Sequence, residues 1–415
     1  MTKLCVIDDS EESLLVATKI LEKDGHTVST YSDPIKFLQN INSENPDLVV
    51  LDIMMPGMDG IEVLRQMRSS EQTKHIKVIV FSSKTFEYDR KLAIDSGADG
   101  FMVKPIRNKE YFLTEVNRLL FQVFNIKFYG VRGTLPVPGE KSLIYGGNTS
   151  CVKVSIPGKN AIIFDCGSGV KKLGDSMVSE KTEANIFITH AHWDHLNAFP
   201  FFTPLYIPGN KVRVYGPKSP GSSVSKMISD QMSDIYFPIT VQEFGGHLDY
   251  IDLHEESFQL DGIRLSTMLL RHPGNCLGYR IDHGGKSMCY ITDNELFPEK
   301  SSGYSLEYLD KLCNFIAETD VLITDTTYTE EEYPMRVGWG HSSNVEVAKL
   351  AHRANVKKLC LFHHDPNQND QDIEKKWKDT CRVLESLNSE VECLCPKEDE
   401  ELEVRSTLEK SNKTS

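Results

Sequence analysis

Thr189-His190-Ala191-His192-Trp193-Asp194-His195 places three histidines and an aspartate side by side, directly after the apolar run Asn185-Ile186-Phe187-Ile188. That run predicts a buried strand. Crowded imidazole and carboxylate groups are best accommodated by a shared cation, and zinc-like divalent ions bind this ligand set readily. A polar turn that happens to hold three histidines is the alternative. Because a full H-x-H-x-D-H pattern is far more specific than a lone H-x-H, the stretch predicts a metal site at a strand end.

The composition is that of an ordinary globular protein. The 415 residues, 40% hydrophobic and 26% charged, are enough for two or three domains. A net charge of −14 disfavours long polyanions, so nucleic acid is not an expected partner. We find neither a membrane-spanning run nor a signal peptide, and the ten cysteines contain no C-x-x-C pair. These features predict a cytoplasmic, reduced protein without a disulfide framework.

The first part of the chain, residues 1–123, alternates apolar strands with amphipathic helices. Strands are expected at 4–7, 26–28, 47–52, 77–81 and 100–103, with helices such as 11–23 and 34–41 between them. This alternation predicts an α/β fold with a doubly wound parallel sheet. Such sheets gather functional groups where their strands end, and these ends carry Asp8, Asp9, Asp52, Ser82 and Lys104.

These strand-end residues have one chemical interpretation. Three carboxylates suit Mg²⁺, which prefers oxygen ligands. Asp52 can act as a nucleophile toward a phosphoryl group. The Ser82 hydroxyl and the Lys104 ammonium can then hold the phosphoryl oxygens. An ordinary α/β domain with polar strand ends is the alternative, but it would require five positions to coincide.

Residues 1–123 resemble the receiver domain of two-component response regulators, which has a flavodoxin-like fold. The matching motifs are Val6-Ile7-Asp8-Asp9-Ser10, Leu51-Asp52-Ile53-Met54-Met55-Pro56-Gly57 and Met102-Val103-Lys104-Pro105. The resemblance implies that Asp52 accepts the phosphoryl group from a histidine kinase or a phosphotransfer protein. It also implies that Asp8, Asp9, Asp52 and the backbone of Met54 form a Mg²⁺ site. Ser82, Phe101 and Lys104 would be the switch residues.

The junction between the two parts is short. A helix is expected over 111–123, and only Phe124-Asn125 separates it from an apolar strand that begins at Ile126. Because no glycine-, serine- or proline-rich linker intervenes, we expect direct mechanical coupling rather than a free tether. The second domain is expected over 126–404, and the polar tail 405–415 is expected to be disordered.

Further metal ligands are expected at the ends of later strands in the second domain. Apolar runs precede His272, Asp293 and the pair His363-His364. A dinuclear site needs such additional histidines and a bridging carboxylate. Taken alone, His272 or Asp293 would be an ordinary core or loop residue. Because the H-x-H-x-D-H motif already predicts a metal site, His272 and Asp293 are predicted to be further ligands of that site.

The second domain resembles the metallo-β-lactamase superfamily, an αββα sandwich that hosts dinuclear metal hydrolases. The H-x-H-x-D-H motif and the later strand ends carry the resemblance, and Gly130-Val131-Arg132-Gly133 and Tyr145-Gly146-Gly147-Asn148-Thr149 point to its phosphodiesterase and tRNA 3′-processing endonuclease branch. It implies two divalent metals, zinc first and manganese or iron as alternatives. One would be bound by His190, His192 and His272, the other by Asp194, His195 and His363, with Asp293 bridging them. His363 is preferred to His364 because the family's ligand lies three residues before a proline.

A catalytic role is expected for Asp194 and for His341. The resemblance places a histidine-serine motif beside the scissile phosphate, so His341 could protonate the leaving oxygen. In the alternative, Ser342 or Ser343 caps a helix and His341 only lines the turn. Asp325 could orient a ligand from behind.

Three functions fit these features. The first is a phosphodiesterase for a small or cyclic nucleotide, controlled by phosphorylation of Asp52. The second is a nuclease or another hydrolase, such as a lactonase, that uses the same metals. The third is a non-catalytic diiron or dizinc sensor, against which His192 argues because oxygen-binding relatives usually carry glutamate there. A homodimer is left open.

Overall fold

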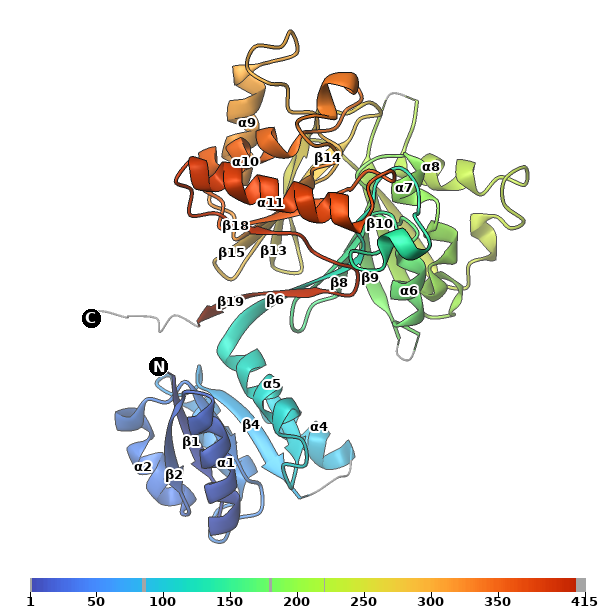
Figure 1. The fold of residues 1–415 in the computed structure, drawn as a ribbon. Helices are drawn as coiled ribbons and strands as arrows, with labels where there is room; N and C mark the ends of the chain where they lie inside the picture. The colour runs from blue at the N-terminus through green and yellow to red at the C-terminus, as the bar shows by residue number, and fades with distance from the viewer. Residues whose placement is uncertain (1, 84–86, 179–180, 220, 408–415) are drawn as a thin grey trace. The chain divides into compact units, whose positions relative to one another are not determined.

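The computed structural model describes residues 2–83, 87–178, 181–219 and 221–407, and the chain divides into two compact units after residue 122 (Figure 1). Each unit has its own hydrophobic core. Among the helices within these ranges, none has both the length and the apolar character that a bilayer crossing requires.

The first unit is a five-stranded parallel sheet with the order β2-β1-β3-β4-β5. Its strands are β1 (Lys3–Ile7), β2 (Thr27–Tyr31), β3 (Leu48–Leu51), β4 (Lys77–Ser82) and β5 (Gly100–Val103). The intervening helices are α1 (Glu11–Lys23), α2 (Pro34–Glu44), α3 (Gly60–Ser69), α4 (Glu87–Asp95) and α5 (Lys109–Leu120). Apolar side chains of α1 and α5 pack in one core cluster, and those of α2 and α3 pack in another. The predicted doubly wound, flavodoxin-like fold is confirmed.

The second unit contains two seven-stranded sheets. The first has the order β11-β10-β9-β8-β7-β6-β19 and the second the order β12-β13-β14-β15-β16-β17-β18. The first comprises β6 (Phe121–Gly130), β7 (Cys151–Ser155), β8 (Ala161–Phe164), β9 (Glu183–Phe187), β10 (Lys211–Pro217), β11 (His247–Leu253) and β19 (Glu401–Thr407). The second comprises β12 (Ser257–Leu260), β13 (Ile263–Leu269), β14 (Leu277–His283), β15 (Lys286–Ile291), β16 (Val321–Asp325), β17 (Lys358–Phe362) and β18 (Glu392–Leu394).

These two sheets pack face to face, and helices cover their outer faces (Figure 1). Buried side chains of both sheets, such as Phe164, Tyr279 and Tyr290, form the central core. The helices are α6 (Val170–Asp175), α7 (Trp193–Leu196) and α8 (Val224–Gln231) beside the first sheet, and α9 (Leu306–Ile316), α10 (Asn344–Arg353) and α11 (Asp370–Ser386) beside the second. The predicted αββα sandwich is confirmed.

Two boundaries differ from the sequence prediction. Helix α5 ends at Leu120, not at residue 123, and β6 begins at Phe121. Burial of Phe124, Ile126 and Phe128 follows the period of a strand, so the expected connector Phe124-Asn125 is part of β6. Strand β19 extends to Thr407, so residues 405–407 are not part of an unstructured tail. The remainder of the expected tail, 408–415, lies outside the described residues.

Candidate functional site

The first unit gathers acidic side chains where β1 and β3 end. Oxygen atoms of Asp8, Asp9 and Asp52 lie within 4.8 Å of one another. The Lys104 ammonium is 2.5 Å from the Asp8 carboxylate and 2.9 Å from that of Asp52. Burial raises the pKa of Asp52, although Lys104 opposes this shift. This oxygen-rich group fits Mg²⁺, as expected from the sequence.

The other predicted receiver residues lie on neighbouring elements. Ser82 is buried at the end of β4, and Phe101 is half-buried in β5. The backbone N–H of Met54 donates to Asp52 Oδ1 at 3.3 Å, which places this residue directly beside the expected phosphoacceptor. Asp8, Asp9, Met54 and Lys104 thus lie close to Asp52, whereas Ser82 and Phe101 lie in β4 and β5.

In the second unit, one group of metal-ligating atoms comes from His190, His192, His272 and Asp293. His272 Nε2 lies 3.0 Å from His192 Nδ1. The Nε2 atoms of His190 and His272 each lie 3.5 Å from Asp293 Oδ2. His272, although far from His190 and His192 in sequence, therefore joins them beside the Asp293 carboxylate.

The second group consists of Asp194, His195, His363 and again Asp293. Asp194 Oδ2 lies 3.1 Å from the Nε2 atoms of both His195 and His363. Asp293 Oδ1 lies 3.2 Å from His195 Nε2 and 3.1 Å from His363 Nε2. The two oxygens of Asp293 thus face different groups, which is the arrangement of a bridging carboxylate.

The donor atoms fit two divalent metals. His190 Nε2 is buried and has no hydrogen-bond partner among the described residues, which is an unusual state for a buried polar atom. Burial lowers the pKa of His190 well below its usual range and so favours the neutral ring, the form that binds metal. Burial alone would raise the pKa of Asp293, but His195 and His363 outweigh it and hold this pKa low. The ligand roles of the seven residues stay a prediction that this geometry accommodates.

His363 and His364 occupy different environments. His363 joins the second group, whereas His364 Nε2 lies 3.7 Å from the Cys395 sulfur. His364 is fully buried, and burial lowers its pKa well below the usual range. The placement of His363 in the cluster agrees with its choice as the expected ligand.

Each group of ligands is held from behind by hydrogen bonds. Asp165 Oδ2 lies 2.7 Å from His195 Nδ1 and accepts from the Tyr290 hydroxyl at 3.0 Å. Thr189 donates to the same carboxylate through its backbone N–H and its hydroxyl. Such contacts orient metal-binding rings and are typical of metal sites.

Asp325 connects the expected proton donor to the ligand cluster. One of its oxygens lies 2.8 Å from His341 Nδ1, and the other accepts from the Thr327 hydroxyl at 2.7 Å. That hydroxyl is 3.1 Å from His363 Nδ1. Burial disfavours the charged form of His341, but Asp325 outweighs this effect and raises the pKa of His341 to about 9. Ser343, in turn, is the N-cap of α10, so capping and placement of His341 beside the cluster coexist.

Backbone geometry brings these groups together. Asp165, Asp293 and His363 all adopt positive φ angles of 59°, 54° and 59°, which are uncommon for residues other than glycine. A Cβ atom at Gly133 would lie 2.2 Å from His363 Cε1, and one at Gly340 would lie 2.3 Å from His272 Nδ1. Both glycines are therefore required for close approach to expected ligands.

The cluster opens into a pocket of about 370 Å³. Its lining includes Asp194, Asp293 and His341, together with Arg336 and Trp339 from the loop that precedes α10. The backbone N–H of Thr134, also in the lining, donates to Asp194 Oδ2 at 2.7 Å. Five of the predicted metal ligands thus line this pocket together with His341, namely His192, Asp194, His272, Asp293 and His363, whereas His190 and His195 do not line it.

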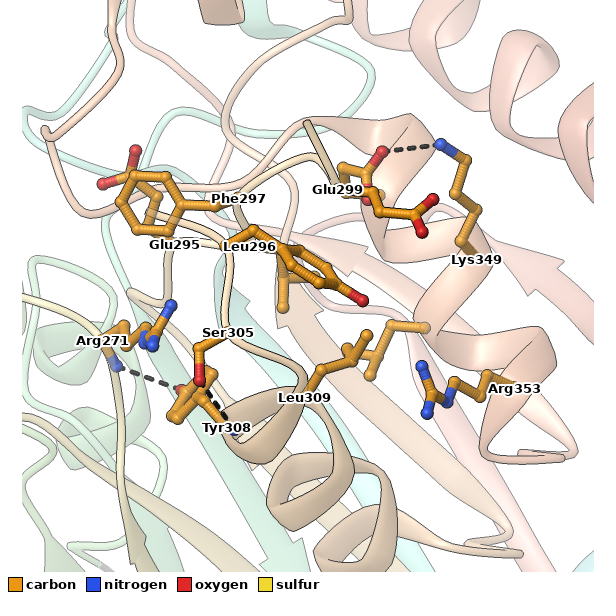
Figure 2. Close-up of a pocket in the computed structure, with 13 residues that line it drawn as sticks. Arg271, Glu295, Leu296, Phe297, Glu299, Ser305, Tyr308, Leu309, Lys349 and Arg353 are labelled. Carbon is orange, nitrogen blue, oxygen red and sulfur yellow. Dashed lines mark hydrogen bonds and ion pairs between the residues drawn. The ribbon is translucent and has the colours of Figure 1, made fainter. Parts of the chain in front are cut away.

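A second pocket, of about 310 Å³, lies behind the ligand-bearing loops, between α9 and α10 (Figure 2). Arg271 precedes His272, and the central carbon of its guanidinium lies 4.4 Å from the centre of the Tyr308 ring. The backbone N–H of Arg271 donates to the Tyr308 hydroxyl. Figure 2 shows the carboxylate of Glu295 on the opposite side of the group from Lys349 and Arg353. Residues that line this second pocket therefore support the segments that carry His272 and Asp293.

Several supporting residues had no prediction from the sequence. Asp165 follows the apolar run 161–164, so the same strand-end rule could have identified it. Glu295, only 3% exposed, accepts hydrogen bonds from Tyr333, Gly338 and Gly340. No sequence pattern distinguishes Glu295 from a surface acid, because its role depends on a loop about forty residues away.

Family models match both units. The response regulator receiver domain matches residues 4–116, and the beta-lactamase superfamily domain matches residues 160–364. Receiver relatives include Protein PilH of Pseudomonas aeruginosa, 32% identical over 29% of this chain and 98% of that protein. The transcriptional regulatory protein PhoP of Bacillus subtilis is 38% identical over 26% of this chain, which spans 44% of PhoP.

The second unit is similar to Ribonuclease Z of Thermoplasma acidophilum, with 24% identity over 64% of this chain and 96% of that protein. Among solved structures, the metallo-beta-lactamase fold protein YhfI of Bacillus subtilis aligns with a TM-score of 0.50 at 18% identity, over 68% of this chain and all of YhfI. These matches support a metal-dependent hydrolase with a divalent metal site. The chain therefore belongs to the response regulators and carries a receiver domain followed by a domain of the beta-lactamase superfamily.

Proposed function

We propose that the second unit hydrolyses phosphodiester bonds of a small or cyclic nucleotide under the control of Asp52 phosphorylation. One observation carries the proposal. Two groups of ligand atoms meet on the two oxygens of Asp293, and His341, held by Asp325, borders the same pocket. A two-metal phosphodiesterase would combine these parts, namely a dinuclear centre and a proton donor beside the bond that breaks.

His190, His192 and His272 would hold one divalent metal, and Asp194, His195 and His363 the other, with Asp293 shared between them. We propose zinc, with manganese or iron as alternatives. When bound, such a pair supplies a water nucleophile at neutral pH and neutralises charge on the phosphoryl oxygens. The fixed positions of Asp194 and Asp293 would keep the two ligand groups adjacent.

His341 is proposed to serve the leaving oxygen. Its Nδ1 atom faces Asp325, so Nε2 is the atom that can deliver a proton. Attack of water on phosphorus forms one P–O bond and breaks the bond to the leaving oxygen. The leaving oxygen takes the proton from His341, and the proton that the attacking water loses passes to solvent, from which His341 is reprotonated. Asp325 would hold the ring in one orientation and stabilise its charged form.

The choice of substrate rests on charge and on the relatives. The net charge of −14 opposes a long polyanion, which favours a small nucleotide. RNA is the second candidate, because a relative that matches the second unit over 96% of its own length is a Ribonuclease Z. Salt-sensitive cleavage of RNA in preference to small diesters would support this second candidate.

The first test combines metal analysis with hydrolysis of bis(p-nitrophenyl) phosphate by the intact protein and by Asp194→Ala. We expect about two metal ions per chain and turnover that Asp194→Ala abolishes. Two bound metals without turnover on this ester or on a panel of nucleotide diesters would contradict a phosphodiesterase.

The role of His341 is tested by the leaving group. p-Nitrophenolate leaves without much help from an acid, whereas a ribose alkoxide needs its proton. His341→Ala should therefore lower kcat on a cyclic nucleotide by about a hundredfold or more, and should have a smaller effect on bis(p-nitrophenyl) phosphate. Equal losses on both substrates would argue against proton donation.

Control by the receiver is tested with acetyl phosphate as phosphodonor. A histidine kinase or phosphotransfer protein would be the natural donor. We expect acetyl phosphate to change the hydrolysis rate of the wild type and to leave that of Asp52→Asn unchanged. A response that persists in Asp52→Asn would contradict this account of regulation.

A further inference from the structure

The rim of the metal pocket carries an exposed tryptophan. Trp339 lines the pocket beside His341 and His363, yet its side chain is 59% exposed. A large aromatic ring gains most from burial, so exposure at the mouth of a site suggests that a ligand covers the ring. We propose that Trp339 and Arg336 bind the nucleobase of the substrate; this inference rests on the phosphodiesterase function proposed above.

The loop that carries Trp339 is firmly held. The buried Glu295 carboxylate accepts from the N–H groups of Gly338 at 2.7 Å and Gly340 at 2.8 Å, on either side of the tryptophan. It also accepts from the Tyr333 hydroxyl at 2.9 Å, where the loop begins. A buried carboxylate that accepts three hydrogen bonds fixes the loop backbone. Trp339 is therefore presented on a prearranged backbone, which lowers the entropy lost when a flat ligand stacks on it.

The same loop is tied to the metal cluster. The carbonyl oxygen of Gly340 lies 2.9 Å from His272 Nδ1, and His341 follows directly in the chain. A base on Trp339 would thus be bound by the segment that also positions an expected ligand and the proton donor. This places the recognised base close to the scissile phosphate rather than at a distant subsite.

Arg336 completes the recognition surface. Its guanidinium lies 5.0 Å from the centre of the Trp339 ring and lines the pocket. Among the described residues, no ion pair joins Arg336 to a carboxylate. A cation beside an aromatic ring can stack on a base or attract the phosphate attached to it. The ligand that fits both features is a nucleoside phosphodiester.

Two substrates with the same leaving group separate base recognition from chemistry. One is thymidine 5′-(p-nitrophenyl phosphate), and the other is methyl p-nitrophenyl phosphate, which has no base. For the metal-loaded full-length protein we expect a higher kcat/KM on the thymidine ester. Trp339→Ala should lower this value by about tenfold or more, because stacking on an aromatic side chain contributes that much per base.

The methyl ester should change by less than about twofold in Trp339→Ala, and Trp339→Phe should retain most of the preference for the thymidine ester. Met335→Ala is the matched control, since Met335 lies in the same loop, is 77% exposed and does not line the pocket. It should leave both values unchanged.

The outcomes distinguish the two proposals. Turnover of both esters with no preference for thymidine, or a preference that Trp339→Ala leaves intact, overturns base recognition alone. Equal losses on both esters in Trp339→Ala do the same, because they indicate a general disturbance of the site. If the metal-loaded wild type hydrolyses neither of the two esters, both the phosphodiesterase function and base recognition are overturned.

Discussion

The acidic group of the receiver and the histidine-rich group of the second unit are both built where strands end, but their chemistry differs. The receiver offers carboxylate oxygens, with Lys104 already between Asp8 and Asp52. The second unit offers imidazole nitrogens together with the carboxylates of Asp194 and Asp293. Oxygen ligands suit Mg²⁺, whereas mixed nitrogen and oxygen ligands suit zinc-like ions. The same strand-end rule therefore predicts two metal sites of different selectivity in one chain.

The two sites also differ in how their ligands are supported. In the receiver, Asp9 is exposed to solvent. In the second unit, His195, His272 and His363 each have a hydrogen-bond partner behind the ring, namely Asp165, Gly340 and Thr327. Supported ligands lose less freedom on binding and hold their ion more tightly. The comparison predicts an exchangeable ion in the receiver and a retained pair in the second unit.

Asp293→Asn should have the largest effect on the second unit and no effect on the receiver. Loss of the bridging charge should reduce hydrolysis on the order of a thousandfold or more, about 4 kcal/mol, since metal-assisted stabilisation is worth several kcal/mol. Phosphorylation of Asp52 by acetyl phosphate should be unaffected. Metal content, hydrolysis and phosphorylation are measured on the same preparation.

Asp261→Asn is the control for this change. Asp261 is exposed, lies in a turn and also has a positive φ of 52°, so it tests the loss of a carboxylate at the same backbone geometry. If Asp293→Asn retains both metals and its activity, the assignment of a bridging carboxylate is wrong.

A second contrast concerns Lys104, which is partly buried, and Lys376, which is fully buried. Burial opposes the charge of Lys104, but Asp52 and Asp8 outweigh it and raise the pKa of Lys104. Lys376 in α11 is fully buried and donates to the backbone carbonyls of Thr326 and Thr327 and to the Gln368 side chain. Burial there lowers the pKa of Lys376 to about 8.

The sign of the resulting pH dependence follows from proton binding. Between about pH 8 and 10.5 the unfolded chain keeps the Lys376 proton, whereas the folded chain releases it. The free energy of unfolding should therefore rise with pH in this window, by about 3 kcal/mol at most. Lys376→Met should remove that rise, while the exposed Lys349→Met should not.

Urea unfolding at pH 7.5 and pH 10, followed by tryptophan fluorescence, measures this effect. Trp193, Trp339 and Trp377 all lie in the second unit, so the signal reports that unit. An equal pH dependence in wild type and Lys376→Met would show that Lys376 does not titrate in this range.

Asp165→Asn should have a smaller effect, and it tests whether the hydrogen bond behind His195 strengthens metal binding. Without the carboxylate behind His195, the affinity for metal should fall by about 10- to 100-fold, and activity should recover at saturating metal. Mg²⁺ binding by the receiver should not change. Competition with a metal-sensitive dye gives the affinity.

Asp320→Asn is a matched control for that measurement. Asp320 is also a buried carboxylate, but it pairs with Lys286 and Lys357 just before β16 begins, at the opposite end of that strand from Asp325. Equal losses of metal affinity in the two variants would indicate general destabilisation rather than support of His195.

The sequence predicted most of what strand ends can reveal. The receiver fold follows from the alternation of apolar strands and helices, whereas the αββα sandwich and the set of metal ligands were expected from the family resemblance. The seven residues expected to bind metal in the second unit lie together around the Asp293 carboxylate. The end of α5 was predicted wrongly because an apolar stretch near residue 121 fits either a helix or a strand.

Features that depend on distant contacts could not be predicted. Lys376 lies in a charged stretch whose pattern predicts a solvated helix face. Its ammonium nevertheless points inward to the carbonyls of Thr326 and Thr327. Glu295 likewise gains its role from Gly338 and Gly340. In each case the partner is fixed by tertiary packing, which local periodicity does not encode.

The pairing of β6 with β19 has a consequence for biosynthesis. On a ribosome, β6 emerges long before β19, and every strand of the other sheet is made between them. Until β19 arrives, one edge of β6 offers unpaired backbone groups to neighbouring nascent chains. His190 and His363 are likewise separated by most of the translation time of this unit. The expected set of metal ligands is therefore complete only late in synthesis.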